Sequence, residues 1–170
     1  MKQVLALSLV AMLFAETAGA RPAVQLQGTT DAFTPIGCLF PEDHVILSIS
    51  DNGKHLASKT YCTTFGKSTA KLVTDTRGVT YLLLEYGVGR GTNATEYFLD
   101  VDRLEGDLKQ VFRKLISTAT GPSSRYRYEY KAQTPKTGGL TLTLTLRADP
   151  DSECCVPKQK RRVYQIDAPP

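Results

Sequence analysis

Four cysteines are the residues of this chain with the most definite chemistry. Cys38, Cys62, Cys154 and Cys155 make an even set, which in an exported protein indicates disulfide bonds. Of the three pairings that four cysteines allow, Cys38–Cys62 is slightly favoured, because it would bridge a hairpin centred on Asn52-Gly53. Cys154 and Cys155 would then stand free, form a distorted vicinal bond, or bind a partner. Free thiols there would indicate a thiol- or metal-handling periplasmic protein.

The two histidines, His44 and His55, flank the same predicted hairpin. In a tight antiparallel pair they could approach each other, and imidazole together with thiolate suits zinc or copper. The sequence contains neither an HxxxH nor a CxxC spacing that would support such a site. We therefore predict two solvent-facing histidines, no metal site and no cofactor.

Catalytic residues are not indicated by any recognisable motif. A serine or cysteine nucleophile needs an oriented base nearby, but the sequence has no GxSxG, and neither histidine lies in a motif context. Paired carboxylates for glycoside hydrolysis could be drawn from Glu85, Glu96, Asp100 and Asp102. Because any β domain with alternating acidic residues offers such pairs, we assign no catalytic residue. A small secreted hydrolase using carboxylates stays an alternative function.

Three glycines, Gly87, Gly89 and Gly91, follow an apolar run and resemble a phosphate-binding loop only superficially. A dinucleotide site needs GxGxxG spacing followed by a helix, whereas here the spacing is GxGxG and a strand is predicted to follow. We interpret the segment as a bulged, flexible hairpin connection.

A ladder of tyrosines and charges occupies residues 125–131, of sequence RYRYEYK. Aromatic faces beside cations can stack on sugar rings or bases. The binding candidates are therefore Tyr126, Tyr128, Tyr130, Arg125 and Arg127. The alternative interpretation is that the tyrosines face the edge of a core and the charges face water, since side chains alternate along a strand.

The elements that would position these residues are mostly strands separated by turns. Residues 79–86 (VTYLLLEY) indicate a central strand buried on both faces, and residues 140–147 (LTLTLTLR) alternate cleanly. Further strands are predicted at 45–50, 56–62, 70–74, 95–103, 125–131 and 163–166. Their spacing indicates a mainly β fold, a single antiparallel sandwich or barrel-like meander.

One segment supports two interpretations. In residues 108–116 (LKQVFRKLI), apolar side chains fall at the spacing of an amphipathic helix, and Asp107 could cap it. The neighbouring strands and tight turns favour a strand instead. The pattern alone favours one short helix near 107–117.

The amino-terminal residues predict export. Lys2 precedes a largely apolar run of twelve residues, 4–15, and small residues stand before a predicted cleavage site at Arg21, as in a signal peptide. We therefore predict a signal peptide over 1–20 and one mainly β domain over 21–170. This domain would have an irregular lead-in at 21–37, a tail at 167–170 and no transmembrane segment. The expected location is secreted or periplasmic.

Charge and composition restrict the partners only broadly. The formal net charge is +4, with basic residues gathered at 125–131 and 158–162, which we interpret as solvated surface. Export disfavours nucleic acid as a partner. The leading hypothesis is an exported non-catalytic binding domain whose partner is a protein or a cell-envelope glycan, as for an inhibitor or immunity protein.

Overall fold

The computed structural model describes six stretches of the chain, residues 22–28, 44–63, 68–89, 94–120, 123–148 and 160–167. All regular structure in these stretches is β-strand. The strands are β1 (Ala23–Gly28), β2 (His44–Asp51), β3 (Lys54–Cys62), β4 (Thr69–Thr74), β5 (Thr80–Gly89), β6 (Ala94–Leu104), β7 (Leu108–Thr120), β8 (Ser123–Gln133), β9 (Leu140–Ala148) and β10 (Arg161–Ile166). The predicted mainly β class is confirmed.

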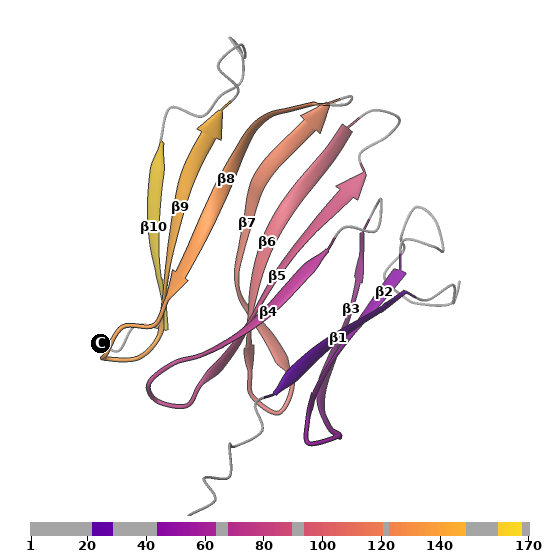
Figure 1. Ribbon diagram of the computed structural model, residues 1–170, viewed down its shortest axis with the longest axis vertical. Helices are drawn as coiled ribbons and strands as arrows, with labels where there is room; N and C mark the ends of the chain where they lie inside the picture. Colours follow the sequence, from indigo (N-terminus) through magenta and orange to yellow (C-terminus); the bar gives the residue numbers. More distant parts are fainter. Residues whose placement is uncertain are drawn as a thin grey trace, which may run out of the picture.

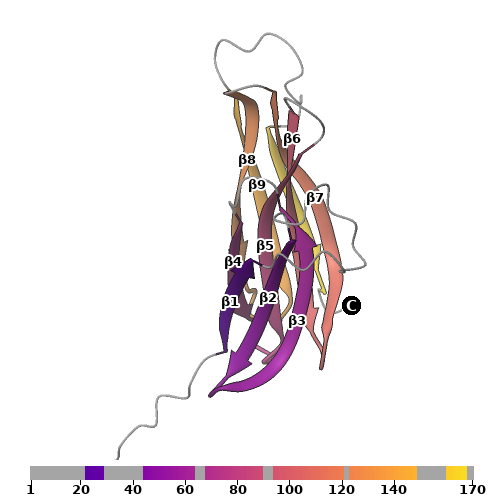
Figure 2. The same cartoon turned by 90° about the vertical axis from the view of Figure 1, so that its right-hand side faces the viewer.

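Two antiparallel sheets contain these strands. A three-stranded sheet has the order β1-β2-β3, and a seven-stranded sheet has the order β10-β9-β8-β7-β6-β5-β4, so each strand pairs with its neighbours in sequence. Figure 1 shows the small sheet on one side of β4–β7 and strands β8–β10 on the other. Figure 2 turns the small sheet toward the viewer, in front of the large one.

The centre of the structure is β5, which is buried on both faces as its sequence predicts. Leu82 and Leu84 are fully buried against side chains of the small sheet, including Leu47 and Ile49. Leu83 points the other way, into a second cluster with residues of β6 to β10. Because strand side chains alternate, one strand supplies both cores and fixes the small sheet relative to the large one.

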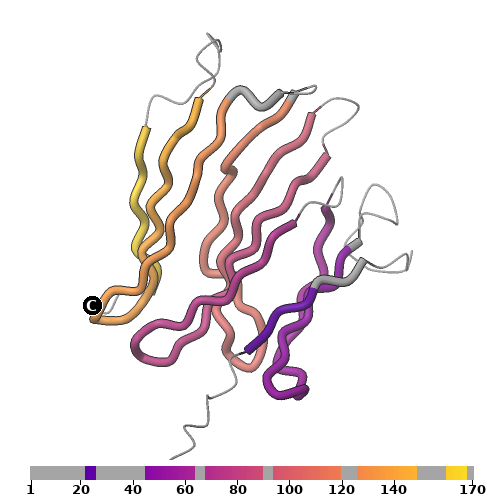
Figure 3. Tube along the Cα trace, in the orientation of Figure 1, coloured from indigo at the N-terminus to yellow at the C-terminus, as the bar shows by residue number. Residues whose placement is uncertain are grey.

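The large sheet folds over its own apolar face. β7 and β8 pair only where Ser117–Thr120 meets Ser123–Arg127. Over the rest of its length β8 pairs with β9, and the traces of β7 and β8 separate in Figure 3. The leucines of β9 therefore meet β5 and β6 across a shared core. As the alternation of 140–147 predicts, one face of β9 is buried, with Leu140, Leu142 and Leu144 in the core.

A buried carboxylate joins the turn between β4 and β5 to the turn between β8 and β9. Asp75, in the turn between β4 and β5, accepts hydrogen bonds from the backbone amides of Arg77 and Val79, both at 2.9 Å. It also accepts one at 2.6 Å from the amide of Gly139, between β8 and β9. Burial alone would raise the pKa of Asp75, but these amides and the Arg77 side chain hold it below its usual value.

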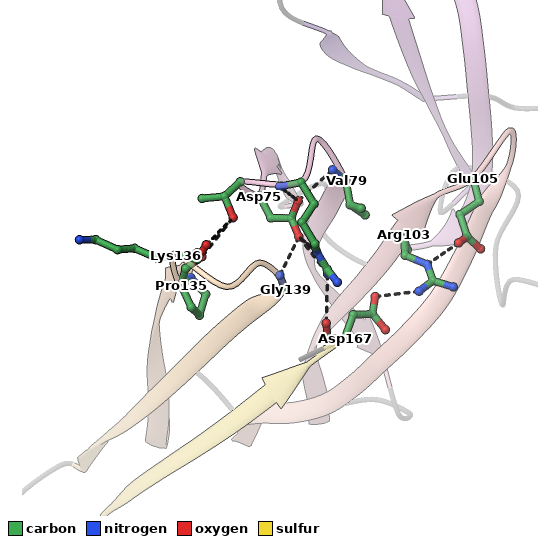
Figure 4. Close-up of polar contacts among 10 residues, drawn as sticks. Asp75, Val79, Arg103, Glu105, Pro135, Lys136, Gly139 and Asp167 are labelled. Atoms are coloured by element: carbon green, nitrogen blue, oxygen red, sulfur yellow. Dashed lines mark hydrogen bonds and ion pairs between the residues drawn. The ribbon is translucent and has the colours of Figure 1, made fainter. Parts of the chain in front are cut away.

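Further polar contacts extend this junction to the end of β10, as Figure 4 shows. The Arg77 guanidinium donates to the carbonyl of Asp167 at 3.1 Å. Arg103 of β6 forms ion pairs with Glu105 at 2.8 Å and with the Asp167 carboxylate at 3.1 Å. Loops from both halves of the large sheet are thus held together at one end.

The prediction of a short helix near 107–117 is wrong, because Leu108–Thr120 form the strand β7. β7 pairs with β6 along its length, but Phe112 and Gln110 face Val101 and Asp102, so Val111 between them is an extra residue. In the same way, Ser117 and Leu115 face Tyr97 and Phe98, so Ile116 is a second extra residue of β7. Each bulge shifts the alternation by one residue. A twice-bulged strand therefore shows the three- and four-residue spacing of apolar side chains that is typical of a helix.

Two further expectations can be compared with the strands. The lead-in predicted to be irregular contains β1, which pairs with β2 from Ala23 opposite Ser50 to Gly28 opposite Val45. The Asn52-Gly53 turn is confirmed, with positive φ at both residues. The predicted signal peptide and residues 168–170 of the predicted tail lie outside the described residues.

We expect Gly139→Ala to destabilise the fold more than Gly53→Ala. Both glycines have φ near +80°, at +79° and +77°, so alanine costs about 1–2 kcal/mol at either position. At Gly139 a Cβ would also lie 2.7 Å from the Ile166 carbonyl oxygen, whereas at Gly53 it meets open space. The clash should add about 1–3 kcal/mol to the loss in the free energy of unfolding, measured in urea. Equal losses would contradict the tight closure at Gly139.

Candidate functional site

An open cleft lies between β3 of the small sheet and β5–β7 of the large sheet. Its volume is about 280 Å³, near the lower end of small-ligand sites. Charged, aromatic and apolar side chains line it: Lys59, Thr60, Tyr61, Cys62, Tyr86, Val88, Phe98, Asp100, Gln110 and Arg113. Several titratable side chains gather in this cleft, which makes it the candidate site.

Beside the cleft, two carboxylates of β6 meet one ammonium of β3. Asp100 and Asp102 are 2% and 1% exposed. Lys59 Nζ lies 2.8 Å from one oxygen of Asp102 and 2.9 Å from the other, and 3.4 Å from Asp100 Oδ2. Asp100 and Asp102 are two residues apart on a strand and therefore point to the same face, toward the small sheet.

Tyr86 and Arg113 extend the ion pairs toward the mouth of the cleft. The Tyr86 hydroxyl donates to Asp100 Oδ2 at 3.1 Å, and Arg113 donates to the Tyr86 hydroxyl. Arg113 Nε lies 3.4 Å from Asp100 Oδ1, and its guanidinium carbon lies 4.9 Å from the centre of the Phe98 ring. The side chain of Arg113 is half exposed, so it connects the buried cluster with solvent.

Burial shifts the protonation of this cluster. It raises the pKa of Asp102, although the hydrogen bonds and charge of Lys59 act in the opposite direction. Burial, followed by the negative charge of Asp100, also raises the pKa of Tyr86, so this hydroxyl stays protonated at neutral pH and can donate. With both carboxylates ionised, Lys59 and Arg113 balance their charge.

One oxygen of this cluster accepts no hydrogen bond. Asp100 Oδ1 is buried without a hydrogen-bond partner among the described residues, and Arg113 approaches it only as an ion pair. Buried polar atoms are nearly always hydrogen-bonded in folded proteins. Beside the cleft, a buried acceptor to which no described residue donates thus lies next to a guanidinium that solutes can reach.

Two residues of this site were in the carboxylate set predicted from the sequence. Asp100 and Asp102 come together, whereas Glu85 forms an ion pair with Arg127, away from them. Lys59, Tyr86 and Arg113 were missed by sequence reasoning. The available signal was an acidic residue at every second position of one strand, but only the docked small sheet shows that this face is buried.

The tyrosine ladder lies mostly inside the structure. Tyr128 is 2% exposed and belongs to the core of the large sheet, with Arg162 over its ring at 5.3 Å. Tyr126 and Tyr130 are half-buried against the same core, whereas Arg127 is exposed. The Arg125 side chain lies outside the described part. Tyr128 is therefore not accessible as a stacking platform, and binding by the ladder stays a prediction.

The two histidines do not approach each other. His44 is opposite Cys62 and His55 is opposite Ser50, so they stand at opposite ends of the β2–β3 hairpin. His55 is exposed, as predicted. Over the described ranges, no group of three or more histidine, cysteine or acidic side chains could hold a metal ion.

Of the four cysteines only Cys62 is described. It lines the cleft and has an interaction partner. Cys38, Cys154 and Cys155 lie outside the described residues, so the pairing stays a prediction.

The glycine-rich segment is only in part a connection. Gly87 and Gly89 belong to β5, and a Cβ on Gly87 would lie 3.1 Å from the Tyr97 ring, so this glycine allows close packing against β6. Gly91 lies outside the described residues.

Comparisons with known proteins gave no matching family model, no matching curated protein and no matching solved structure. In the described part of the chain, no helix has the length and hydropathy of a membrane span.

We expect Lys59→Met to destabilise the protein at neutral pH by about 3–5 kcal/mol, because it leaves buried carboxylates without their ammonium. Lys71→Met, at an exposed position of β4, is the control and should change stability by less than about 0.5 kcal/mol. The free energies of unfolding would be measured in urea at several pH values.

The pH dependence of this loss has a definite sign. A carboxyl whose folded pKa is raised binds its proton more tightly when folded, so ionisation removes stability as the pH rises from about 4 through the folded pKa. Without Lys59 the pKa of Asp102 should rise further, and the cost should shrink as the pH falls toward 4. A loss independent of pH would show that lost packing, not charge, causes it.

Proposed function

We propose that this chain is an exported, non-catalytic binding domain and that the cleft between β3 and β5–β7 holds its ligand. The observation that carries the proposal is the charge-balanced cluster of Lys59, Asp100, Asp102 and Arg113 beside an open cavity. Convergent polar groups in a concave, partly apolar site are typical of small-ligand binding. The ligand would be a free small molecule or an exposed unit of a larger partner, such as a cell-envelope glycan or a protein.

The same cluster argues against hydrolysis by carboxylates. In a glycosidase the scissile bond lies between the two carboxyl groups. Here the Lys59 ammonium contacts both Asp100 and Asp102 and occupies that position. Both carboxylates are also almost fully buried. The arrangement suits recognition and cohesion better than turnover.

Export and disulfide bonding belong to the same proposal. The signal-peptide pattern before Arg21 and the even number of cysteines support a secreted or periplasmic location. A disulfide at Cys62 would also brace one wall of the cleft.

An intact-mass measurement on protein purified after export tests this part. We expect a chain beginning at Arg21 and no mass increase on alkylation of the unreduced protein, since all four cysteines would be oxidised. Two alkylatable thiols at Cys154 and Cys155 would instead support a thiol- or metal-handling protein. An uncleaved chain with four free thiols would contradict export.

Blocking the cleft should weaken ligand binding. Gln110, an exposed residue of β7, lines the cleft, so Gln110→Trp should fill its mouth without disturbing the core. Gln133→Trp, at an exposed position of β8, is the matched control. The probes are glucose, galactose, N-acetylglucosamine, glycine, acetate and phosphate, with binding measured by NMR.

We expect at least one probe to bind the wild-type protein and the Gln133→Trp variant. Its affinity should fall at least about tenfold in Gln110→Trp, since the tryptophan occupies the ligand's volume. Equal affinity in both variants, or no binding of any probe to the wild type, would contradict a binding site in this cleft.

A further inference from the structure

We infer that the cleft takes a neutral, hydroxyl-bearing ring, that is, one saccharide unit. The inference rests on the proposed function and names its ligand class. It is carried by three features of the cleft: an acceptor without a donor, a donor fork that solutes can reach, and a balanced charge.

The acceptor is Asp100 Oδ1. The other oxygen of this carboxylate is engaged by Tyr86 at 3.1 Å and Lys59 at 3.4 Å. None of the described residues donates a hydrogen bond to Oδ1, and the half-exposed Arg113 side chain lies over it with Nε at 3.4 Å. A ligand hydroxyl that turns Arg113 aside would supply the missing hydrogen bond. A hydroxyl is a suitable donor, because a charge-assisted hydrogen bond to a carboxylate is stronger than one between neutral groups.

The donors lie next to this acceptor. Arg113 Nε is 3.4 Å from Asp100 Oδ1, and the exposed Gln110 side chain lines the same cleft. A guanidinium offers five N–H donors in a fixed fork and no acceptor. Adjacent acceptor and donor groups match adjacent hydroxyls of a sugar, since each hydroxyl both donates and accepts.

Charge argues for a neutral ligand. Lys59 and Arg113 are balanced by Asp100 and Asp102, so the site as a whole does not select an ion. An anion would have to compete with Asp100 for Arg113, and a cation would have to compete with Lys59 for the carboxylates. A neutral polyol makes hydrogen bonds to both kinds of group without adding a charge to the cluster.

The size and walls of the cleft fit one ring. Phe98 and Val88, which are both partly exposed, give it apolar surface against which the C–H face of a sugar can pack. A volume of about 280 Å³ suits one unit and not a chain. A longer glycan would present its terminal residue.

The test compares sugars with ions on two arginine variants. Glucose, galactose, N-acetylglucosamine, glycine, acetate and phosphate are titrated into ¹⁵N-labelled protein, following the Arg113 Nε–H and Gln110 side-chain signals. Arg113→Lys keeps the charge but loses the fork. Arg147→Lys, at an exposed arginine of β9 that pairs with Glu129, is the matched control.

We expect a neutral sugar to shift the cleft signals and to bind at least about tenfold more weakly to Arg113→Lys, but equally to Arg147→Lys. Should Arg113→Lys not fold, Gln110→Trp takes its place. If glycine, acetate or phosphate binds in the cleft and the sugars do not, the saccharide inference is wrong while the binding function stands. If sugars bind without moving the cleft signals, the inference is also wrong. If no probe binds, both proposals fail.

Discussion

The contact of Lys59 with Asp100 and Asp102 is the main polar constraint between the two sheets and on the site beside it. Two carboxylates that are 1–2% exposed cannot stay ionised at low cost without a cation beside them. The cation comes from β3, the edge of the small sheet, and it links that sheet to β6. The cleft lies beside this contact, because Lys59 and Asp100 line it.

Hydrophobic burial on β5 complements this polar contact. Leu82 and Leu84 hold the small sheet, and Leu83 faces the core that the folded large sheet encloses. At one end Asp75 closes the large sheet by binding amides from two different turns, including that of Gly139. One wall of the cleft is therefore formed by β5, a strand packed on both faces. A rigid wall suits a site that holds a ligand in a fixed geometry.

Much of this fold could be predicted from the sequence, because its signals are local. Asn52-Gly53 specifies a hairpin turn through positive φ, and the burial of 79–86 follows from a run of apolar residues. For β7 the spacing alone favoured a helix over the strand that its neighbours indicated, since bulges at Val111 and Ile116 give it the spacing of a helix. The spacing of apolar residues indicates which side chains share a face. It does not show where a bulge changes that face, because bulges are set by pairing with β6.

The candidate site was less predictable than the fold, because contacts distant in sequence create it. Asp100 and Lys59 are 41 positions apart, and neither residue type is unusual in a strand. The tyrosines of 125–131 were the more conspicuous pattern, yet Tyr128 lies in the core. A buried charge cluster becomes visible only when two sheets are in place.

The most direct test is a crystal structure of the protein grown with N-acetylglucosamine. We expect one sugar ring between β3 and β7, with a hydroxyl within hydrogen-bond distance of Asp100 Oδ1 and another on the Arg113 guanidinium. An empty cleft in which protein groups satisfy Asp100 Oδ1, or a sugar bound only elsewhere on the surface, would contradict it.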